Sequence, residues 1–321
     1  MLLKVEHSLA FSYDGYISES FLELRVQPKA TRAQTVVSFS LAVGPPARVF
    51  RYRDWNDNLA HHFTVTKFHD RIEVMSRSVV DTHPVATSPT AVTDAVPLPE
   101  LPFAFRDFLV VDGPIRLTSA LRDVHRAIPA SVKAPLGEQV AAIGAHLHQE
   151  FDYQRHVTRY DSTTDDFLKL RAGVCQDFAH LALGLLRLRG IPCRYVSGYL
   201  HVERASEELA QSHAWIELYA PSVGWLPFDP THNVVPDERY VIVGHGRHYD
   251  DVPPNRGIYR GAAKETLAAH VRTEQLPGVT PAPVQEEVVP LDLPVFTEVP
   301  VRRVERPPTA DEAAAEEQQQ Q

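Results

Sequence analysis

The sequence predicts an α+β protein in which a small antiparallel β-sandwich precedes a domain built from a helix packed on an antiparallel sheet. Three observations support this fold class. Apolar residues alternate with period two up to about residue 80, a stretch rich in Pro, Thr, Ser and Ala follows, and helical periodicity then gives way to further strand-like segments. We expect a sandwich at residues 1–81, a linker at 82–102, a second domain at 103–270 and a disordered, acidic and proline-rich tail at 276–321.

The N-terminal strands are predicted from short alternating runs at residues 21–26, 35–41 and 71–74, which Pro, Gly, Asn and Asp separate. Because no helical period lies between these runs, they favour a sandwich of about 80 residues. The segment that follows, THPVATSPTAVTDAVPLPELP, offers little apolar surface for burial and is therefore interpreted as a linker.

Two helices are predicted after the linker. Residues 137–150 place apolar side chains at positions i, i+3 and i+7, and residues 175–189 show the same pattern more strongly. Asp177 in the first turn, Gly190 just past the end and Pro192 after it are typical of the two ends of a helix. The apolar face of the second helix contains Phe178, Leu181, Ala182, Leu185 and Leu188.

Three strands and a tail are predicted next. Residues 193–200, 213–219 and 224–229 are rich in aromatic and β-branched residues, which is typical of strands. From about Leu276 onward, prolines and acidic pairs replace the periodic pattern. Such a composition cannot bury enough apolar surface to fold, so we expect a disordered tail whose removal leaves folding unchanged.

Charge and composition exclude several classes of partner. The formal net charge is −9 and no run of Lys or Arg occurs, so nucleic acids and anionic membrane surfaces are not expected as partners. In the N-terminal sequence MLLKVEHSLAFSYDG, charged or polar residues interrupt the apolar stretch, which predicts neither a signal peptide nor a membrane span. We therefore expect a cytoplasmic protein, and its oligomeric state is left open.

Cys175 is the candidate nucleophile. The chain has two cysteines, Cys175 and Cys193, and both are expected to be reduced because a thiol enzyme needs its sulfur free. A thiol ionises more readily at a helix N-terminus, where unpaired backbone amides favour negative charge and can also hold an oxyanion. Cys175 opens the predicted helix behind Gly173. The alternative is an inert core cysteine, but such a residue is expected within the apolar face.

His213 and Asp229 are the candidate base and the group that orients it. His213 opens a predicted strand, and alternation places it on the same face as Trp215 and Glu217. Asp229 ends the next strand, and neighbouring strands lie about 4.8 Å apart, so a hydrogen bond between the two side chains is feasible. Such a bond fixes the imidazole tautomer that accepts the thiol proton. Taken singly, a surface histidine and a turn aspartate are the alternatives.

The 16 histidines raise the alternative of a metal site. His146 and His148 are two residues apart on a predicted helix and so lie on different faces. Cys175, His213 and Asp229 are ligand types that a metal accepts, but no CxxC or HExxH spacing occurs. We therefore expect neither a metal nor another cofactor. The other histidines that lie close to one another in the sequence, or close to the three candidate residues, are His61, His62, His232, His245 and His248.

The residues of the candidate site lie in segments that resemble the core of the bacterial transglutaminase-like superfamily. These segments are LRAGVCQDFAHLALGLLRLRGIPCRYVSGYL (170–200), SHAWIELYAPSVGWLPFDPTHN (212–233) and RYVIVGHGRHYDDVPPNRGIYRG (239–261). The N-terminal strands, with Pro28, Gln34 and the run DWNDN, resemble the sandwich region that precedes that core in many such proteins. The motifs GVCxDFA, SHAWxE and GWxxFDP are specific in combination.

The resemblance implies a papain-like fold with Cys175, His213 and Asp229 as a catalytic triad and no required metal. It also implies thioester chemistry on peptide or protein amides, resolved by water in a peptidase or by an amine in a transglutaminase. Two features depart from the family pattern: the sandwich run lacks a Gly that often precedes its Asn, and the tail lies outside the resemblance. A catalytically silent binding module with the same fold and a metal-dependent hydrolase are the alternative functions.

Accessory roles remain open at the sequence level. A side-chain oxyanion donor, usually aromatic in transglutaminases, is not matched by a motif; Tyr153 and Tyr160 are considered, but core packing is favoured for each. Trp215 and Trp225 could line a substrate groove, although aromatic residues on strands usually belong to the core.

Overall fold

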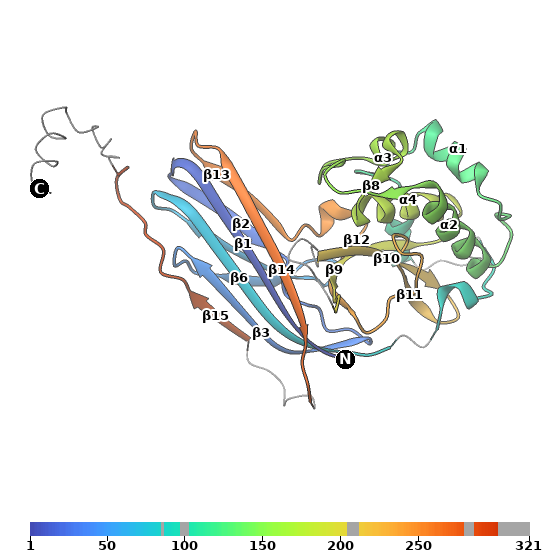
Figure 1. Ribbon diagram of the computed structural model, residues 1–321, viewed down its shortest axis with the longest axis horizontal. Coiled ribbons are helices and arrows are strands. Elements are labelled where there is room, and N and C mark those ends of the chain that lie inside the picture. The colour runs from blue at the N-terminus through green and yellow to red at the C-terminus, as the bar shows by residue number, and fades with distance from the viewer. Residues whose placement is uncertain (85–86, 97–102, 204–211, 279–285, 301–321) are drawn as a thin grey trace, which may run out of the picture.

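The protein has two halves that lie side by side in the computed structural model (Figure 1). The structure describes residues 1–84, 87–96, 103–203, 212–278 and 286–300. One half is a β-sandwich, and the other, which we call the core domain, carries the α-helices on a sheet of its own. The predicted α+β class is therefore confirmed.

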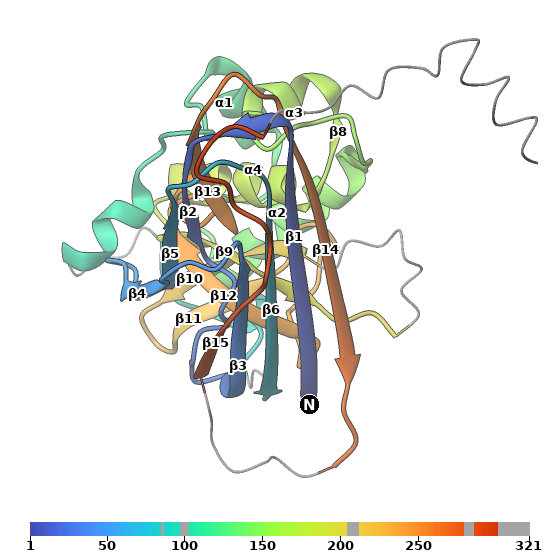
Figure 2. The same cartoon turned by 90° about the vertical axis from the view of Figure 1, so that its left-hand side faces the viewer.

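Two sheets form the sandwich. The larger sheet has the strand order β14-β1-β6-β3-β15 and the smaller one the order β13-β2-β5-β4. Figure 2 shows β3, β6, β1 and β14 running side by side. The strands are β1 (Leu2–Ile17), β2 (Glu19–Leu24), β3 (Gln34–Gly44), β4 (Phe50–Arg53), β5 (Leu59–Val65), β6 (His69–Thr82), β13 (Asn255–Arg260), β14 (Glu265–Gln275) and β15 (Glu286–Pro290).

The alternating sequence pattern explains the sandwich interior. Along β1 every second residue is buried, and the same alternation occurs in β3 and β6. Side chains from both sheets, such as Phe39 of the larger and Phe63 of the smaller, are almost fully buried between them. The period of two in the sequence therefore sets which face of each strand enters this interior.

The sandwich extends beyond the predicted boundary at residue 81. β13 pairs antiparallel with β2, β14 pairs antiparallel with β1, and β15 pairs parallel with β3. The predicted domain at 103–270 was therefore wrong at its C-terminal side, because these strands satisfy the backbone groups of edges that would otherwise be open. The predicted tail was also wrong for residues 286–300, whereas residues 279–285 and 301–321 lie outside those that the structure describes.

The predicted linker is packed on the core domain where the structure describes it. Val92 and Val96 are buried with the helices of that domain, and the amide of Gly137 donates to the carbonyl of Val92 at 2.9 Å. A Cβ at Gly137 would lie 2.4 Å from the carbonyl oxygen of Thr90, so the close approach needs glycine. The interpretation as a loose linker was wrong for these residues, and 85–86 and 97–102 lie outside the described chain.

The core domain packs helices against an antiparallel sheet of order β11-β10-β9-β12. Both predicted helices and all three predicted strands are present, with ends within one residue or two. α1, α3 and β12 were not predicted. The elements are η1 (Pro89–Ala91), η2 (Phe103–Leu109), α1 (Ser119–Ala127), α2 (Leu136–Glu150), β7 (Asp152–Tyr153), α3 (Thr164–Leu170), β8 (Ala172–Gly173), α4 (Cys175–Leu188), β9 (Cys193–Leu200), β10 (Ser212–Ala220), β11 (Gly224–Phe228), β12 (Tyr240–Gly246) and η3 (Tyr249–Asp251).

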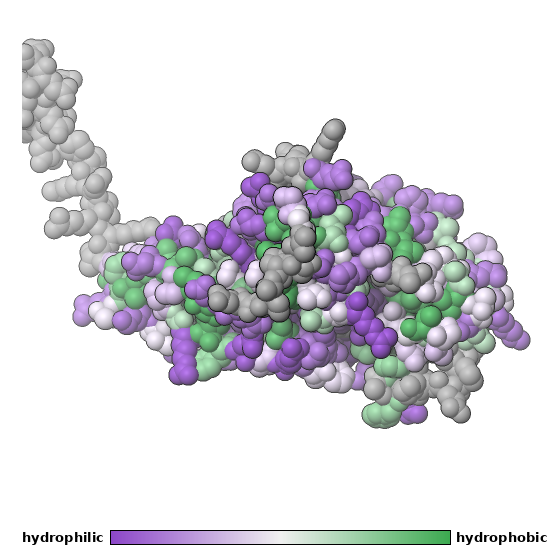
Figure 3. All heavy atoms as spheres, turned by 90° about the horizontal axis from the view of Figure 1, so that it is seen from below, coloured by the Kyte–Doolittle hydropathy of each residue, from purple (hydrophilic) through white to green (hydrophobic). Residues whose placement is uncertain are grey.

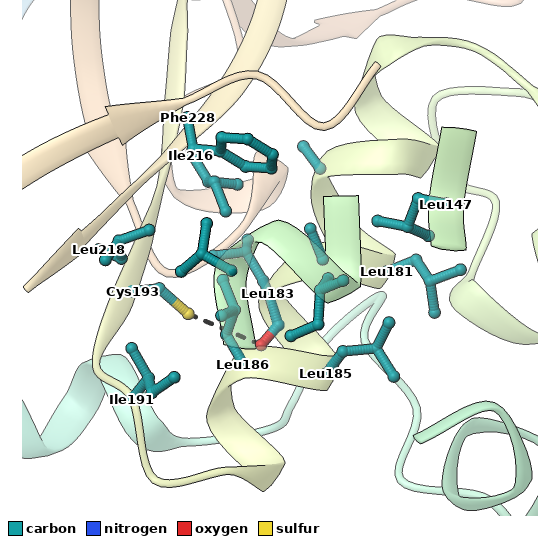
Figure 4. Packing of buried hydrophobic residues seen from close by; sticks show 14 of the residues in the cluster. Leu147, Leu181, Leu183, Leu185, Leu186, Ile191, Cys193, Ile216, Leu218 and Phe228 are labelled. Carbon is teal, nitrogen blue, oxygen red and sulfur yellow. Dashed lines mark hydrogen bonds between the residues drawn. The ribbon is translucent and has the colours of Figure 1, made fainter. Parts of the chain in front are cut away.

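α4 is the buried centre of the core domain (Figure 4). Its leucines lie between α2 on one side and the strands β9 and β10 on the other; Leu181, Leu183 and Leu185 are fully buried. Burying one such side chain contributes about 1.5–3 kcal/mol. This packing fixes the axis of α4, and with it the position of the residue at its N-terminus.

Two side-chain amides of the sandwich hold β12 of the core domain. Gln34 accepts from the amide of Ile242 at 2.8 Å and donates to the Ile242 carbonyl at 2.7 Å. Asn58 makes the same pair of bonds with the backbone of His245, both at 2.8 Å. Each amide thus replaces a partner strand for a buried backbone pair. These four bonds, together with an apolar cluster that both halves share, hold the two halves against each other.

Among the described residues, no helix is both long and apolar enough to cross a membrane. The face of the molecule in Figure 3 carries hydrophilic residues with smaller hydrophobic groups interspersed among them.

Candidate active site

Cys175 is the first residue of α4 and is half-buried. The first amide that bonds back within the helix is that of Asp177, which donates to the Val174 carbonyl at 2.9 Å. The backbone amides of Cys175 and Gln176 precede it and therefore have no intrahelical acceptor. The structure thus places the sulfur beside unpaired N–H groups at the positive end of a helix dipole, as the sequence predicts.

The turn into α4 is held by a buried carboxylate. Asp177 is 2% exposed, and its Oδ2 accepts from the amide of Val174 at 2.8 Å and from the hydroxyl of Thr158 at 2.7 Å. Burial raises the pKa of Asp177 against these hydrogen bonds. A Cβ at Gly173 would lie 2.5 Å from the same Oδ2. Asp177 therefore positions the helix start, and Gly173 leaves room for it.

His213 and Asp229 form the predicted hydrogen bond. His213 lies at the start of β10, and its Nε2 donates to Oδ2 of Asp229 at 2.8 Å. The Asp229 side chain is 0% exposed and that of His213 only 7% exposed. The alternatives of a surface histidine and a simple turn aspartate are therefore wrong.

Asp229 is also held by four further donors. Its Oδ2 accepts from Nδ1 of His232 at 2.7 Å and from the hydroxyl of Tyr240 at 2.8 Å. Its Oδ1 accepts from the backbone amides of Thr231 and His232. Burial raises the pKa of Asp229, but the hydrogen bonds with the two histidines outweigh it and leave the pKa well below its usual range. The carboxylate is therefore fixed in both charge and position.

The sulfur of Cys175 lies within hydrogen-bond reach of His213. Because Nε2 of His213 is bound to Asp229, Nδ1 is the nitrogen left for the sulfur. Burial lowers the pKa of His213, but the charge of the Cys175 sulfur and the hydrogen bond to Asp229 outweigh it and raise the pKa to about 10. The three residues that the sequence singles out are thus brought together as a connected chain.

A cavity of about 210 Å³ opens onto Cys175 and His213. One side, which we call the core wall, includes Cys175, Tyr195, Ser197 and His213. The other side, the sandwich wall, is formed by His7 and Arg25. Since a water molecule takes about 30 Å³ of liquid volume, the cavity has room for a chemical group of several heavy atoms. The site is therefore shared between the two halves of the molecule.

Sequence reasoning missed Tyr240 near the triad residues, and it considered His232 only as a possible metal ligand and Tyr153 only as an oxyanion donor or a packing residue. Tyr240 and His232 bind Asp229, and their signal was their position shortly after it in the chain. Tyr153 lies on β7, which pairs with the strand that leads into Cys175. Burial and the charge of the Cys175 sulfur together raise the pKa of Tyr153. Only the pairing of β7 with β8 reveals this last proximity.

The four accessory aromatic residues have different environments. Tyr153 is 51% and Tyr160 66% exposed, so core packing, the role favoured from the sequence, was wrong for both. Trp215 is 1% exposed and stacks on His213 with ring centroids 6.1 Å apart, which confirms its place in the core. Trp225 packs against Phe105 and other aromatic rings outside the cavity.

The group with metal-ligating geometry among the described residues differs from the one considered in the sequence. It comprises His213, Asp229 and His232, whose ligand atoms lie within 4.8 Å of one another. Nε2 of His213 and Nδ1 of His232 already donate to the same oxygen, Oδ2 of Asp229. The arrangement is therefore fully accounted for by hydrogen bonds.

Cys193 provides an internal contrast to Cys175. Both cysteines are free, but Cys193 is 0% exposed and its Sγ donates to the carbonyl of Leu183 at 3.6 Å (Figure 4). Burial raises its pKa to about 11. Cys193 is therefore an inert packing residue, and Cys175 is the thiol that faces the cavity.

Two family models match this chain. Residues 122–230 match the transglutaminase-like superfamily, and residues 3–81 match the bacterial transglutaminase-like N-terminal region. The second match covers most of the strands β1 to β6, and the first covers α4, β9, β10 and β11.

Several known proteins are similar to this chain. An uncharacterized protein of Mycobacterium leprae is 32% identical over 295 residues, which cover 85% of this chain and 99% of that protein. The protein-glutamine gamma-glutamyltransferase of Pseudomonas aeruginosa is 30% identical over 158 residues, 45% of this chain and 23% of that protein. The crystal structure of a candidate cysteine protease from Cytophaga hutchinsonii has a TM-score of 0.74 at 23% identity and covers 89% of this chain and 93% of that one, which shows a common fold.

Proposed function

Since this chain belongs to the transglutaminase-like superfamily, we propose that it is an enzyme that transfers the acyl group of a peptide or protein amide through a thioester on Cys175. The expected transglutaminase-like fold is confirmed by the family matches and by the structural neighbour. Cytoplasmic location, and the absence of a nucleic-acid partner, stay predictions from the sequence.

One observation carries the proposal: His213 lies between the Cys175 sulfur and the Asp229 carboxylate, with one ring nitrogen for each. A thiol needs a base that holds its proton, and the base needs a fixed orientation. The charge of the sulfur and the hydrogen bond to Asp229 raise the pKa of His213, so the imidazole is suited to hold the proton that it takes from Cys175. Once His213 has taken this proton, the sulfur attacks as the thiolate.

The reaction begins when the Cys175 sulfur forms a bond to the amide carbon. The electron pair of the carbonyl moves onto oxygen, where the amides at the start of α4 stabilise it. The intermediate collapses, the C–N bond breaks, and His213 gives its proton to the leaving nitrogen. A thioester remains. Water or an amine, deprotonated by His213, then attacks the thioester and releases the sulfur, which restores the starting state.

The similarity to relatives supports the substrate class. The Pseudomonas aeruginosa relative is named for transfer of the γ-glutamyl group of protein glutamine, and its similarity extends over 45% of this chain. A glutamine carboxamide is small enough for the cavity beside Cys175. Protein-bound glutamine is therefore the acyl donor that we propose to test.

The test is acylation of Cys175 by a glutamine-containing peptide. The wild type is incubated with N-carbobenzoxy-glutaminyl-glycine, with and without a primary amine, and products are followed by mass spectrometry. We expect release of ammonia and formation of either the glutamate or the amine adduct. Cys175→Ala should abolish both products, while Cys193→Ala serves as the matched control and should retain them.

Other outcomes would support the alternatives. No product from the wild type, together with slow alkylation of Cys175 by iodoacetamide at about pH 6–7, where an ordinary thiol is mostly protonated, would favour a silent binding module. Loss of activity on treatment with a chelator would instead favour a metal-dependent hydrolase.

A further inference from the structure

His7 is a histidine in the middle of an apolar row. Alternate residues of β1 are buried, and the neighbours of His7 in this row are Val5 and Leu9. Val5 packs against the core sheet with Val241, whereas Leu9 packs in the sandwich interior. His7 thus lies where the interior of the sandwich meets the core domain. A buried polar side chain in such a row calls for a specific reason.

The hydrogen bonds around His7 define its tautomer. The hydroxyl of Tyr199 lies 3.2 Å from the carbonyl oxygen of Val26 and 3.0 Å from Nδ1 of His7. The carbonyl can only accept, so the single hydroxyl proton goes to Val26. Both contacts are then satisfied only if Nδ1 of His7 carries a proton and donates it to the Tyr199 oxygen.

This tautomer leaves Nε2 of His7 as a hydrogen-bond acceptor without a proton. Burial lowers the pKa of His7 to about 4, so the ring is neutral at physiological pH. His7 is 4% exposed, and no hydrogen bond to its Nε2 occurs within the described part of the chain. His7 nevertheless lines the cavity that contains Cys175 and His213. Nε2 is not among the fully buried polar atoms that lack a partner, so the cavity offers a fixed acceptor that water or a bound molecule can satisfy.

Arg25, the other residue of the sandwich wall, cannot take this role. A guanidinium has donors only, and that of Arg25 donates to Asp54 and Glu23. The sandwich wall therefore combines a cation that can only donate, and that is already paired with two carboxylates, with a single open acceptor. Such a wall fits a substrate group that donates an N–H inside the cavity that also contains Cys175.

On the premise that Cys175 forms a thioester as proposed above, we propose that Nε2 of His7 accepts a hydrogen bond from the N–H of the scissile amide. An amide differs from an ester in having this N–H, and the bond holds the nitrogen within the cavity that His7 and His213 line from opposite sides. His7 is thus a specificity-determining residue that favours amide over ester acyl donors. It is supplied by the sandwich, which gives that half a direct part in the reaction.

The test uses two substitutions that separate the ring nitrogens. His7→Asn keeps an N–H for Tyr199 and removes the acceptor at Nε2, whereas His7→Gln puts an oxygen at the reach of Nε2. The two acyl donors are N-carbobenzoxy-glutaminyl-glycine and the γ-p-nitrophenyl ester of N-carbobenzoxy-glutamyl-glycine, which transfer the same acyl group. Acylation of Cys175 is measured in a single turnover by mass spectrometry.

We expect His7→Asn to slow acylation by the carboxamide about five- to twentyfold, the effect of one hydrogen bond in a buried site, and to leave acylation by the ester unchanged. His7→Gln should restore most of the lost rate. Hydrolysis of the ester-derived thioester should be unchanged in both variants, because neither water nor the acid product has an amide N–H. Methyl methanethiosulfonate, which has no N–H, should modify Cys175 at the wild-type rate and so report an intact site.

Three results would overturn the role of His7 while leaving the proposed function standing. They are equal losses with both donors, no loss with the carboxamide, and a loss confined to capture by the amine, which would place the N–H donor on the acyl acceptor. Failure of both donors to acylate the wild type would overturn the proposed function and the role of His7 with it.

Discussion

Two histidines face the same cavity with opposite electrostatic surroundings. His213 on the core wall has a pKa raised to about 10, whereas His7 on the sandwich wall has a pKa lowered to about 4. Burial lowers the pKa of both rings, but only His213 has Asp229 and the Cys175 sulfur beside it to reverse the effect. The same side chain can therefore move a proton on one wall and act as a fixed neutral acceptor on the other.

The largest effect is expected from a substitution of Asp229 that reduces the difference in pKa between His213 and His7. Asp229→Asn takes away the charge that holds His213 as an imidazolium, and we expect acyl transfer to fall about 10²- to 10⁴-fold, as when the orienting carboxylate of a triad is lost. The pKa of His213 should fall, because one of the two interactions that raise it is gone while that with the Cys175 sulfur remains. The alkaline limb of kcat/KM should then move to lower pH.

The pH profile of amide acyl transfer measures both effects. Asp123→Asn, at an exposed carboxylate whose ion pair within the described residues is with Arg126 on α1, is the matched control and should behave as the wild type. An unchanged alkaline limb in Asp229→Asn would show that the carboxylate does not set the charge of His213.

The next largest effect concerns the attachment of the sandwich wall. Asn58→Ala leaves the backbone N–H and carbonyl of His245 without their partner, so we expect a loss of about 2–4 kcal/mol in the free energy of unfolding. Because the cavity is shared between the halves, KM should rise more than kcat falls. Urea unfolding and steady-state kinetics measure the two effects.

Asn56→Ala is the control for this change, since the Asn56 side chain makes no hydrogen bond among those of the described residues and its backbone contacts persist. Equal stability of the two variants would contradict the role of Asn58 in joining the halves.

A smaller effect is expected from removing β15. A chain that ends at Gly278 loses the pairing of β15 with β3 and the backbone bonds between Phe68 and Phe296. We expect Tm to fall by roughly 2–6 °C, which corresponds to one or two kcal/mol for a domain of this size class. Activity at 25 °C should persist, because neither wall of the cavity includes β15.

A chain that ends at Pro300 keeps every one of these contacts and is the control for the truncation. Identical melting of the two chains would restore the expectation, drawn from the sequence, that residues after about 276 do not contribute to folding.

The smallest effect is expected at His232, whose Nδ1 donates a hydrogen bond to Asp229. His232→Ala removes one of the side-chain donors to Asp229 but leaves those of His213 and Tyr240. We expect acyl transfer to fall by about two- to fivefold, less than the value of one full hydrogen bond. His148→Ala, at an exposed position of α2, is the control. A loss as large as that of Asp229→Asn would mean that His232 acts in the reaction itself.

The candidate site was largely predictable because its signals are local. Cys175 behind a glycine at a helix start, and His213 and Asp229 on successive strands, follow from periodicities that extend over a few residues. The hairpin of β10 and β11 then brings the last two together, since neighbouring strands are about 4.8 Å apart. Helix α4 and strands β9 to β11 were found for the same reason.

What the sequence by itself determined about this protein is therefore its α+β class, the chemical identity of its candidate site and most of the elements that carry it. Only the tertiary structure decided that strands near residues 255–290 complete the N-terminal sandwich and that Asn58 binds β12. It also decided that His7 reaches the cavity of Cys175. The physical reason is that pairing between distant strands, and the burial that shifts a pKa, depend on neighbours far away in the chain, which no local period encodes.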